Sequence, residues 1–202
     1  MKWLKSKASG LFGPAPGIFV PKHRIGVTGH VVVVLTSPTG ATKTIETHNI
    51  VTDAGDLYYA ERAVADLNAG TPVPTNFTDV NGTFDGIMEL YTATGSAAPA
   101  KGNDRSDLGT LITDSDQGMD SGYPTVNDSD PNNTGAGTDV ATYHVSYATG
   151  DANGSDIGDV IITNPSPGAT EALLMHAEFA STFEKTSTDT LDVFVNHTFN
   201  GI

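Results

Sequence analysis

The sequence predicts an all-β fold, an antiparallel β-sandwich or jelly-roll-like domain with one short α-helix at about residues 54–67 and long loops. Short apolar runs are separated by stretches rich in Gly, Pro, Ser, Thr, Asn and Asp, the composition of turns between strands. Several of the apolar runs are β-branched or alternate with polar residues. Strands and helices do not alternate regularly along the chain, so the sequence does not indicate a parallel sheet.

The clearest strand signals lie toward the two ends of the chain. Residues 31–35 read Val-Val-Val-Val-Leu, which is typical of a strand buried on both faces. Residues 37–40, Ser-Pro-Thr-Gly, form a turn into an alternating strand at 42–48, so we expect a hairpin. Residues 171–183 and 191–197 alternate again, and the polar stretch between them predicts a long closing hairpin.

One helix is expected between these two regions. Thr52 or Asp53 caps its first turn, and Asp56 places negative charge where the helix dipole favours it. Apolar residues recur at helical spacing and predict a single buried stripe, made of Leu57, Ala60, Val64 and Leu67. The sequence Asn-Ala-Gly at 68–70 ends the helix.

Charge divides the chain into a basic N-terminal arm, residues 1–24, and a β-sandwich domain, residues 25–202. The formal net charge is −14, and because the arm holds five bases and no acid, it carries +5 and the domain −19. Nucleic-acid affinity depends largely on Lys and Arg, so a domain this acidic is not expected to bind DNA or RNA. The Gly- and Asp-rich stretch 95–137 forms a long acidic loop within the domain.

The arm combines basic and aromatic residues with Gly and Pro. Pro14 and Pro16 exclude a long helix and interrupt the apolar core that a signal peptide requires. Two interpretations remain open: a flexible terminus, or an extended arm that binds an acidic neighbouring subunit through aromatic anchors. The residues predicted to bind such a partner are Trp3, Lys5, Lys7, Phe12, Phe19, Lys22 and Arg24.

Composition also limits the chemistry and the surroundings of the chain. It has no cysteine, which excludes disulfides and thiolate metal sites. No apolar run approaches the roughly 18 residues of a membrane span, so no membrane partner is expected. Hydrophobic residues make up only 38% of the chain, so we expect homo-oligomerisation to add burial to a thin core.

One loop has the spacing of a cation site. Asp128, Asp130, Asn132 and Asp139 stand at positions 1, 3, 5 and 12 of a calcium-loop pattern, and their oxygens suit Ca²⁺. Against this, position 6 is Asn133 rather than Gly, and no helices flank the loop. A Ca²⁺ site and a solvated acidic loop both remain open. Two further groups are weaker candidates, namely Asp114, Asp116 and Asp120, and Asp151, Asn153 and Asp156.

No catalytic motif is present. The six histidines form no HExxH pattern, and the sequence has no P-loop and no GxSxG nucleophile elbow. His144, His176 and His197 lie on predicted strands, where cross-strand pairing is able to bring distant residues together; ordinary structural histidines are the alternative. We therefore expect no enzyme and no cofactor apart from the candidate Ca²⁺.

Three motifs resemble a family of phage virion proteins, many of them tail or tail-fibre-like. The segment Asn-Ile-Val-Thr-Asp-Ala-Gly at 49–55 is similar to the motif that opens the helix of that family, and residues 157–162 resemble one of its strands. The residues similar to its closing turn are Lys185, Asp189, Thr190 and Leu191. The resemblance covers roughly residues 27–67 and 138–200.

The chain also departs from this family. The arm and the stretch 95–137 have no counterpart in it. Asp159 stands where the family has a glutamate, and Phe194 is the residue nearest to a tryptophan common in its last strand. What the resemblance implies is a β-sandwich with one helix in a tailed bacteriophage particle, without an active site.

The basic arm and the resemblance to phage virion proteins together indicate a function. We expect a non-enzymatic structural component of the virion, either a capsid-decorating (cement) protein or a tail or collar protein, anchored by its arm and docked through an edge strand. Its expected partners are major capsid or tail subunits and further copies of itself, and its expected place is the virion after synthesis in the host cytoplasm.

Two other classes remain open. The chain is alternatively a receptor- or glycan-binding module of a phage tail fibre, in which exposed Tyr123, Tyr143 and Tyr147 stack on sugars. A phage hydrolase on a β scaffold is the third class, for which the sequence singles out no pair of carboxylates.

Overall fold

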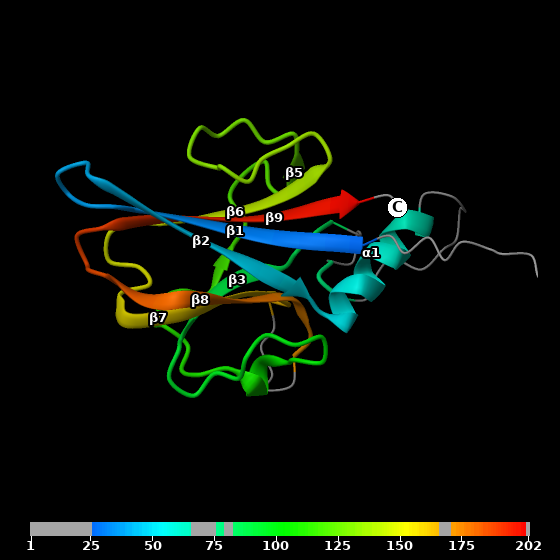
Figure 1. Ribbon diagram of the computed structural model, residues 1–202, viewed down its shortest axis with the longest axis horizontal. Coiled ribbons are helices and arrows are strands. Elements are labelled where there is room, and N and C mark those ends of the chain that lie inside the picture. The colour runs from blue at the N-terminus through cyan, green and yellow to red at the C-terminus, as the bar shows by residue number, and fades with distance from the viewer. Residues whose placement is uncertain (1–25, 66–75, 79–82, 166–170, 201–202) are drawn as a thin grey trace, which may run out of the picture.

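Nine antiparallel strands form one curled sheet around a central core (Figure 1), which confirms the predicted all-β, sandwich-like fold with one short helix. The computed structural model describes residues 26–65, 76–78, 83–165 and 171–200. The strands are β1 (Gly26–Thr36), β2 (Thr42–Val51), β3 (Ile87–Thr92), β4 (Gln117–Gly118), β5 (Thr125–Val126), β6 (Val140–Tyr147), β7 (Gly154–Thr163), β8 (Leu173–Lys185) and β9 (Thr190–Asn200). Their order across the sheet is β4-β3-β7-β8-β2-β1-β9-β6-β5.

The valine run of β1 is buried on both faces, as the sequence predicts. Val31 and Val33 join the main core inside the curl, because alternate side chains of a strand point to opposite faces. Val32 and Val34 point outward, where they form a smaller cluster with Phe194 of β9. The strand is therefore covered on its outer side as well as its inner side.

The hairpin of β1 and β2 is confirmed, with Gly40 in the left-handed region (φ 80°) of its turn. The predicted closing hairpin is wrong. β8 and β9 follow one another in the chain, but β8 pairs with β7 and β2, whereas β9 pairs with β1 and β6. The β1–β2 hairpin lies between them in the sheet. Alternation within a strand indicates its faces and does not identify its neighbours.

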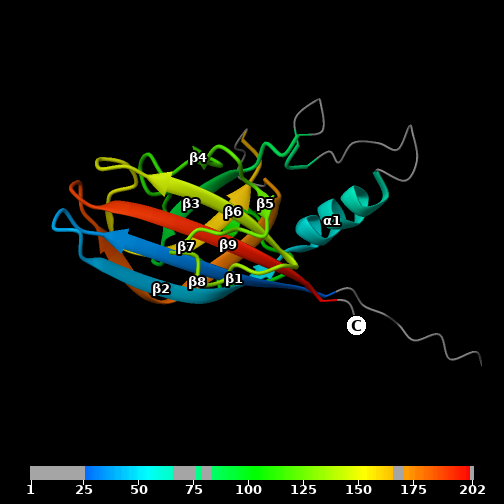
Figure 2. The same ribbon diagram turned by 90° about the horizontal axis from the view of Figure 1, so that it is seen from above.

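Helix α1 (Asp53–Ala65) begins where the sequence predicts, and it packs at one end of the sheet (Figure 2). The predicted apolar stripe is wrong: Leu57 is 52% exposed and Ala60 is exposed, whereas Gly55 and Tyr58 are buried. Leu67 lies outside the described residues. The start of the helix contacts the sheet, where the Thr52 hydroxyl donates a hydrogen bond to the carbonyl of Leu173 in β8.

The acidic stretch 95–137 lies along the outside of the curl and contains three short elements, a 3-10 helix η1 (Arg105–Asp107), β4 and β5. Its first part covers β3 and β7, where Leu108 packs against Tyr91 and Ile161. Its last part crosses β6, β9, β1 and β2 on their outer face and reaches Glu46 of β2, whose carboxylate accepts a 2.7 Å hydrogen bond from the Thr134 hydroxyl.

We expect Gly55→Ala to lower the free energy of unfolding by about 1–3 kcal/mol. A Cβ at this position would stand 2.2 Å from the Leu174 carbonyl oxygen, which belongs to the backbone of β8 and has no room to move. This clash outweighs the better helix propensity of alanine. The matched control is Gly102→Ala, where a Cβ meets nothing within 4 Å. Equal urea-unfolding midpoints for the two variants would contradict this account.

Candidate functional site

β3 and β6, the outermost of the long strands in the sheet, both have backbone partners on their outer sides. β4 pairs with β3, and the Ile112 amide donates to the Leu90 carbonyl at 2.9 Å further along the same strand. At the other side of the sheet, β5 pairs with β6, and the Asp120 amide donates to the His144 carbonyl at 2.9 Å. Residues from the stretch 95–137 thus occupy the outer sides of β3 and β6.

The interior of the sheet contains an unusual interruption at β2. β2 pairs with β1 from Thr42 to Asn49, but in the described part of the chain its other side pairs with β8 only at Asn49–Val51. We call the side of Thr42–His48 that faces away from β1 the open edge of β2. One side-chain contact reaches it from β8, a 2.8 Å hydrogen bond from the Thr47 hydroxyl to the Glu178 carbonyl.

β8 leaves β2 because its own path is irregular. Its register with β7 shifts between Glu178 and Phe183, and the exposed residues 180–182 are left out of the ladder that pairs it with β7. Phe179 and Phe183 stay in the core at 4% exposure each. The burial of these two rings accompanies the bulge, and the strand turns away from β2 (Figure 1). A backbone edge of this kind is able to hydrogen-bond an added strand.

The surroundings of the open edge are acidic. Glu46 lies on β2 itself, on the outer face, where it also contacts His30 Nε2 at 3.5 Å. Glu178 and Glu184 of β8 are exposed, and Lys43 of β2 is an exposed base. His30 and His48 form an aromatic pair on the same outer face, with ring centroids 5.5 Å apart.

The predicted Ca²⁺ residues are engaged within their own loop. Asp128 accepts hydrogen bonds from the Tyr123 hydroxyl at 2.9 Å and from Asn133 Nδ2 at 2.8 Å. Asp130 accepts the amide of Asn132 at 2.8 Å. Asp139 is exposed, and among the described residues no three His, Asp or Glu side chains form a group that could hold a metal ion. The Ca²⁺ site stays a prediction, and these contacts give the aspartates a structural role.

Asn133, which stands where the calcium-loop pattern has Gly, anchors the loop to the sheet. It forms a reciprocal amide pair with Asn196 of β9, with N–O distances of 2.9 and 2.8 Å. Both side chains are buried. Gly135 follows against the same strand, because a Cβ there would come within 2.5 Å of the Asn196 amide.

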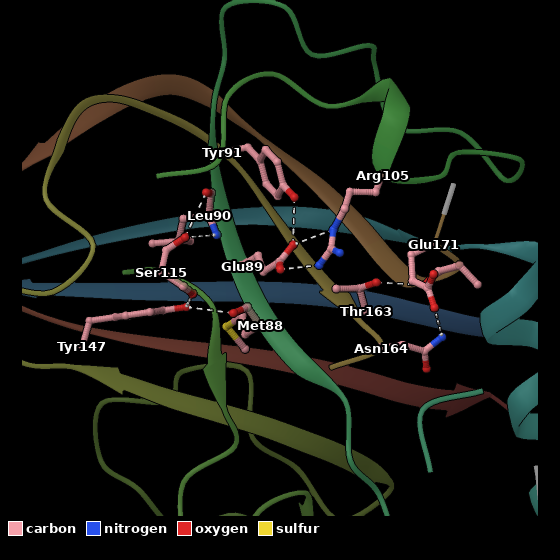
Figure 3. Close-up of polar contacts among 11 residues, drawn as sticks. Met88, Glu89, Leu90, Tyr91, Arg105, Ser115, Tyr147, Thr163, Asn164 and Glu171 are labelled. Atoms are coloured by element: carbon pink, nitrogen blue, oxygen red, sulfur yellow. Dashed lines mark hydrogen bonds and ion pairs between the residues drawn. The ribbon is translucent and has the colours of Figure 1, made fainter. Parts of the chain in front are cut away.

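A buried ion pair, not identified from the sequence, fixes the first part of the stretch 95–137 (Figure 3). Arg105 of η1 reaches Glu89 of β3 with two nitrogens, Nε at 3.1 Å and a second guanidinium nitrogen. The Tyr91 hydroxyl donates to the same carboxylate at 2.8 Å. The Arg105 and Glu89 side chains are only 9% and 1% exposed. Burial and the negative charge of Glu89 raise the pKa of Tyr91, so its hydroxyl keeps its proton.

The three strand histidines do not converge. His144 lies between Asp120 and Asp192, 3.2 Å from each, and stacks on Phe194 with a centroid distance of 4.2 Å. The fully buried His176 contacts Asp159 at 2.9 Å through Nε2. Each histidine thus connects separate segments instead of sharing one centre.

His197 belongs to a third network, between β9, β2 and α1. Its Nε2 accepts a hydrogen bond from Asn49 Nδ2 at 2.8 Å, and Nδ1 bonds to the Tyr59 hydroxyl. Burial lowers the pKa of His197 to about 3, so the ring is neutral. Gly29 is required beside it, since any Cβ there would overlap the Asn49 side chain.

The tyrosines proposed for sugar stacking are mostly buried. Tyr143 and Tyr147 are 2% and 1% exposed and belong to the main core, so their prediction as exposed residues is wrong. Tyr123 is partly buried, and its ring packs edge-on against His144. Alternation places one face of a strand inward, but it does not tell which face, and Tyr143 and Tyr147 share the inner one.

The residues of the resembling closing turn have local structural roles. The Asp189 carboxylate accepts the amide and the hydroxyl of Thr186, at 2.9 and 2.7 Å, and so closes the turn. Lys185 is 1% exposed and donates to the carbonyls of Ala148 and Asp151, at 3.0 and 2.7 Å. These contacts explain Lys185 and Asp189 by structural roles alone.

Two surface hollows lie at the α1 end of the sheet. One, of about 510 Å³, is lined by Tyr58, Tyr59, Arg62, Pro124, Thr125, Val126, Ala141 and Tyr143. The other, of about 400 Å³, lies over the start of β1 and the end of β2 beside Lys101. Burial raises the pKa of Tyr59 and Tyr143, so both hydroxyls in the first hollow keep their protons. Neither set of lining residues contains a nucleophile with a neighbouring base.

All seven arm residues predicted to bind a partner lie outside the described residues. The described part of the chain contains no helix with the length and apolarity needed to cross a membrane. Comparisons with models of known families, with curated proteins and with solved structures find no match for this chain.

We expect Arg105→Met to lower the free energy of unfolding by about 3–5 kcal/mol, because it leaves the buried Glu89 carboxylate without its charge partner. The matched control is Lys101→Met, which breaks an ion pair with Asp56 whose side chains are each 51% exposed and costs less than about 1 kcal/mol. Urea unfolding measures both. The double variant Glu89→Leu/Arg105→Met should regain stability, and a double variant as unstable as Arg105→Met would contradict the role of the charge.

We also expect stability to depend on pH through His197. Its folded pKa is lower than the unfolded value of about 6.5, so below that pH the unfolded chain binds a proton that the folded chain excludes until about pH 3. Stability from this group is therefore complete above about pH 6.5 and falls with decreasing pH. Between about pH 7.5 and about pH 5, His197→Gln should lose about 2 kcal/mol less than the wild type. Equal losses for His197→Gln and the wild type would contradict this account.

Proposed function

We propose that this chain is a non-enzymatic structural component of a tailed bacteriophage particle, a capsid-decorating or tail/collar protein held by its N-terminal arm. The resemblance of residues 49–55 and of the last strands to phage virion proteins names the class. The observation that carries the proposal is the open edge of β2, which offers backbone groups to a partner while the sides of β3 and β6 are occupied.

The use of polar side chains supports the same proposal. Glu89, His176 and His197 are buried groups of the kind that active sites employ, but here they bond to Arg105, Asn103 and Tyr59 and so hold two loops and α1 on the sheet. The outer loop is likewise tied down by Asn133. Interactions of this kind favour a rigid body, which suits a particle subunit. The burial of Tyr143 and Tyr147 weighs against the glycan-binding alternative.

The proposal predicts that the chain is present in particles and that the arm is required. Particles of the virus that encodes the chain should contain it at a fixed copy number by quantitative mass spectrometry after density-gradient purification. A variant without residues 1–24 should unfold in urea at the wild-type midpoint but be lost from the particles. Absence of the full chain from purified particles would refute the proposed function, and normal incorporation of the truncated chain would refute the role of the arm.

A further inference from the structure

We propose that the open edge of β2 receives residues 2–8 of the arm of a second copy, so that copies of the chain join head to tail. The inference rests on the proposed structural role, because it specifies how the subunits of that structure hold one another. The occupant follows from three observations: the position of the edge, the charge on each side of the contact, and the path of the chain.

The start of the domain and the open edge of β2 lie at opposite ends of the sheet. The arm joins the domain at Gly26, the first residue of β1, at the end of the sheet where α1 and the last residues of β9 lie (Figures 1 and 2). The open edge starts at Thr42, beside the β1–β2 turn, at the opposite end. An arm that leaves one end and a receiving edge at the other are the two halves of a heterologous contact, which generates rings or filaments.

The charge and the side-chain alternation of the arm match those of the open edge of β2. The arm carries +5 and the rest of the chain −19. In an antiparallel pairing that sets Lys5 opposite Glu46, Trp3 falls opposite His48 and Lys7 opposite Thr44. Because alternate residues share a face, these three arm residues lie on the outer face. Lys5 then neutralises Glu46, and Trp3 lies beside the aromatic pair of His30 and His48.

The opposite face of the added strand also fits. Leu4 and Ser6 alternate with the outward residues and so point toward the core. On β2, Ile45 is partly buried and packs against the main core. On β8, Phe179 and Phe183 hold the neighbouring part of the core. In this register Ser6 falls opposite Ile45 and Leu4 opposite Thr47, so Leu4 adds apolar surface on the inner face, beside the point where β8 leaves β2.

The path of the chain favours a second copy over the same copy. In the antiparallel register the arm runs toward the β1–β2 turn, so residue 8 emerges at the end of the receiving domain that is remote from Gly26. To serve its own domain, the chain would have to return the length of β1, about 34 Å for its 11 residues. A neighbour stacked end to end needs no reversal, and residues 9–25 span up to about 56 Å.

The test uses the absence of native cysteines. Two full-length single-cysteine variants, Lys7→Cys and Thr44→Cys, are mixed and treated with a short reagent that bridges two thiols. The proposal expects a crosslinked dimer that contains one chain of each variant, identified by mass spectrometry of the joined peptides. The matched control pairs Lys7→Cys with Ala60→Cys, an exposed position on α1 at the other end of the domain, and should give no such dimer.

The double variant Lys7→Cys/Thr44→Cys separates the two sources of the strand. A crosslink confined to monomers, with no dimer in the mixing experiment, would show that each arm folds onto its own domain and would overturn the proposal. A mixing yield no greater than that of the Ala60→Cys control would overturn it too. Neither result requires phage particles, so each is distinguishable from failure of the proposed function, which is measured on particles.

A charge exchange tests the register without cysteines. Lys5→Glu and Glu46→Lys should each weaken self-association by at least about tenfold, since each places like charges opposite one another. The chain with both changes should recover the wild-type solution mass measured by light scattering. Failure of the double exchange to recover association, with each single variant folded, would contradict the pairing of Lys5 with Glu46.

Discussion

The strands of this protein must satisfy the backbone hydrogen bonds at the sides of a curled sheet, and much of the remaining structure depends on this constraint. A buried backbone amide or carbonyl without a partner costs about as much as a lost hydrogen bond. The stretch 95–137 satisfies the requirement on the outer sides of β3 and β6, through Ile112 and Asp120. Its length and polarity therefore have a structural purpose, because it must pass from one side of the curl to the other.

Holding so long a segment against an apolar sheet requires polar anchors. The Arg105–Glu89 pair and the amide pair of Asn133 with Asn196 are buried and specific in geometry, so each fixes one position of the segment on one strand. Buried ion pairs contribute little net stability compared with apolar packing, but the removal of one partner is costly. We infer that these anchors select one arrangement of the segment among many, which hydrophobic contacts such as those of Leu108 alone would not do.

Local features of the fold were predictable from the sequence, and nonlocal ones were not. The β1–β2 hairpin and the first turn of α1 depend on neighbouring residues, the turn at Gly40 and the cap at Thr52. The buried face of α1 depends on Leu174 of β8, which periodicity cannot reveal. The strands that pair with β8 were likewise not predictable from the sequence. Glu89 gave one signal, an acid inside the apolar run Ile87–Tyr91, but its partner Arg105 lies in a loop whose path the sequence does not indicate.

The pairing of β1 with β9 has a consequence for how the protein is made. Val31 pairs with Val195, so contacts that complete the sheet join residues from distant parts of the chain. High contact order of this kind slows folding, since a large loop must close before these contacts form. During synthesis the valine run of β1 therefore stays unpaired on the side that β9 will occupy until β9 has emerged from the ribosome. The nascent chain is expected to need a chaperone during that interval more than the finished domain does.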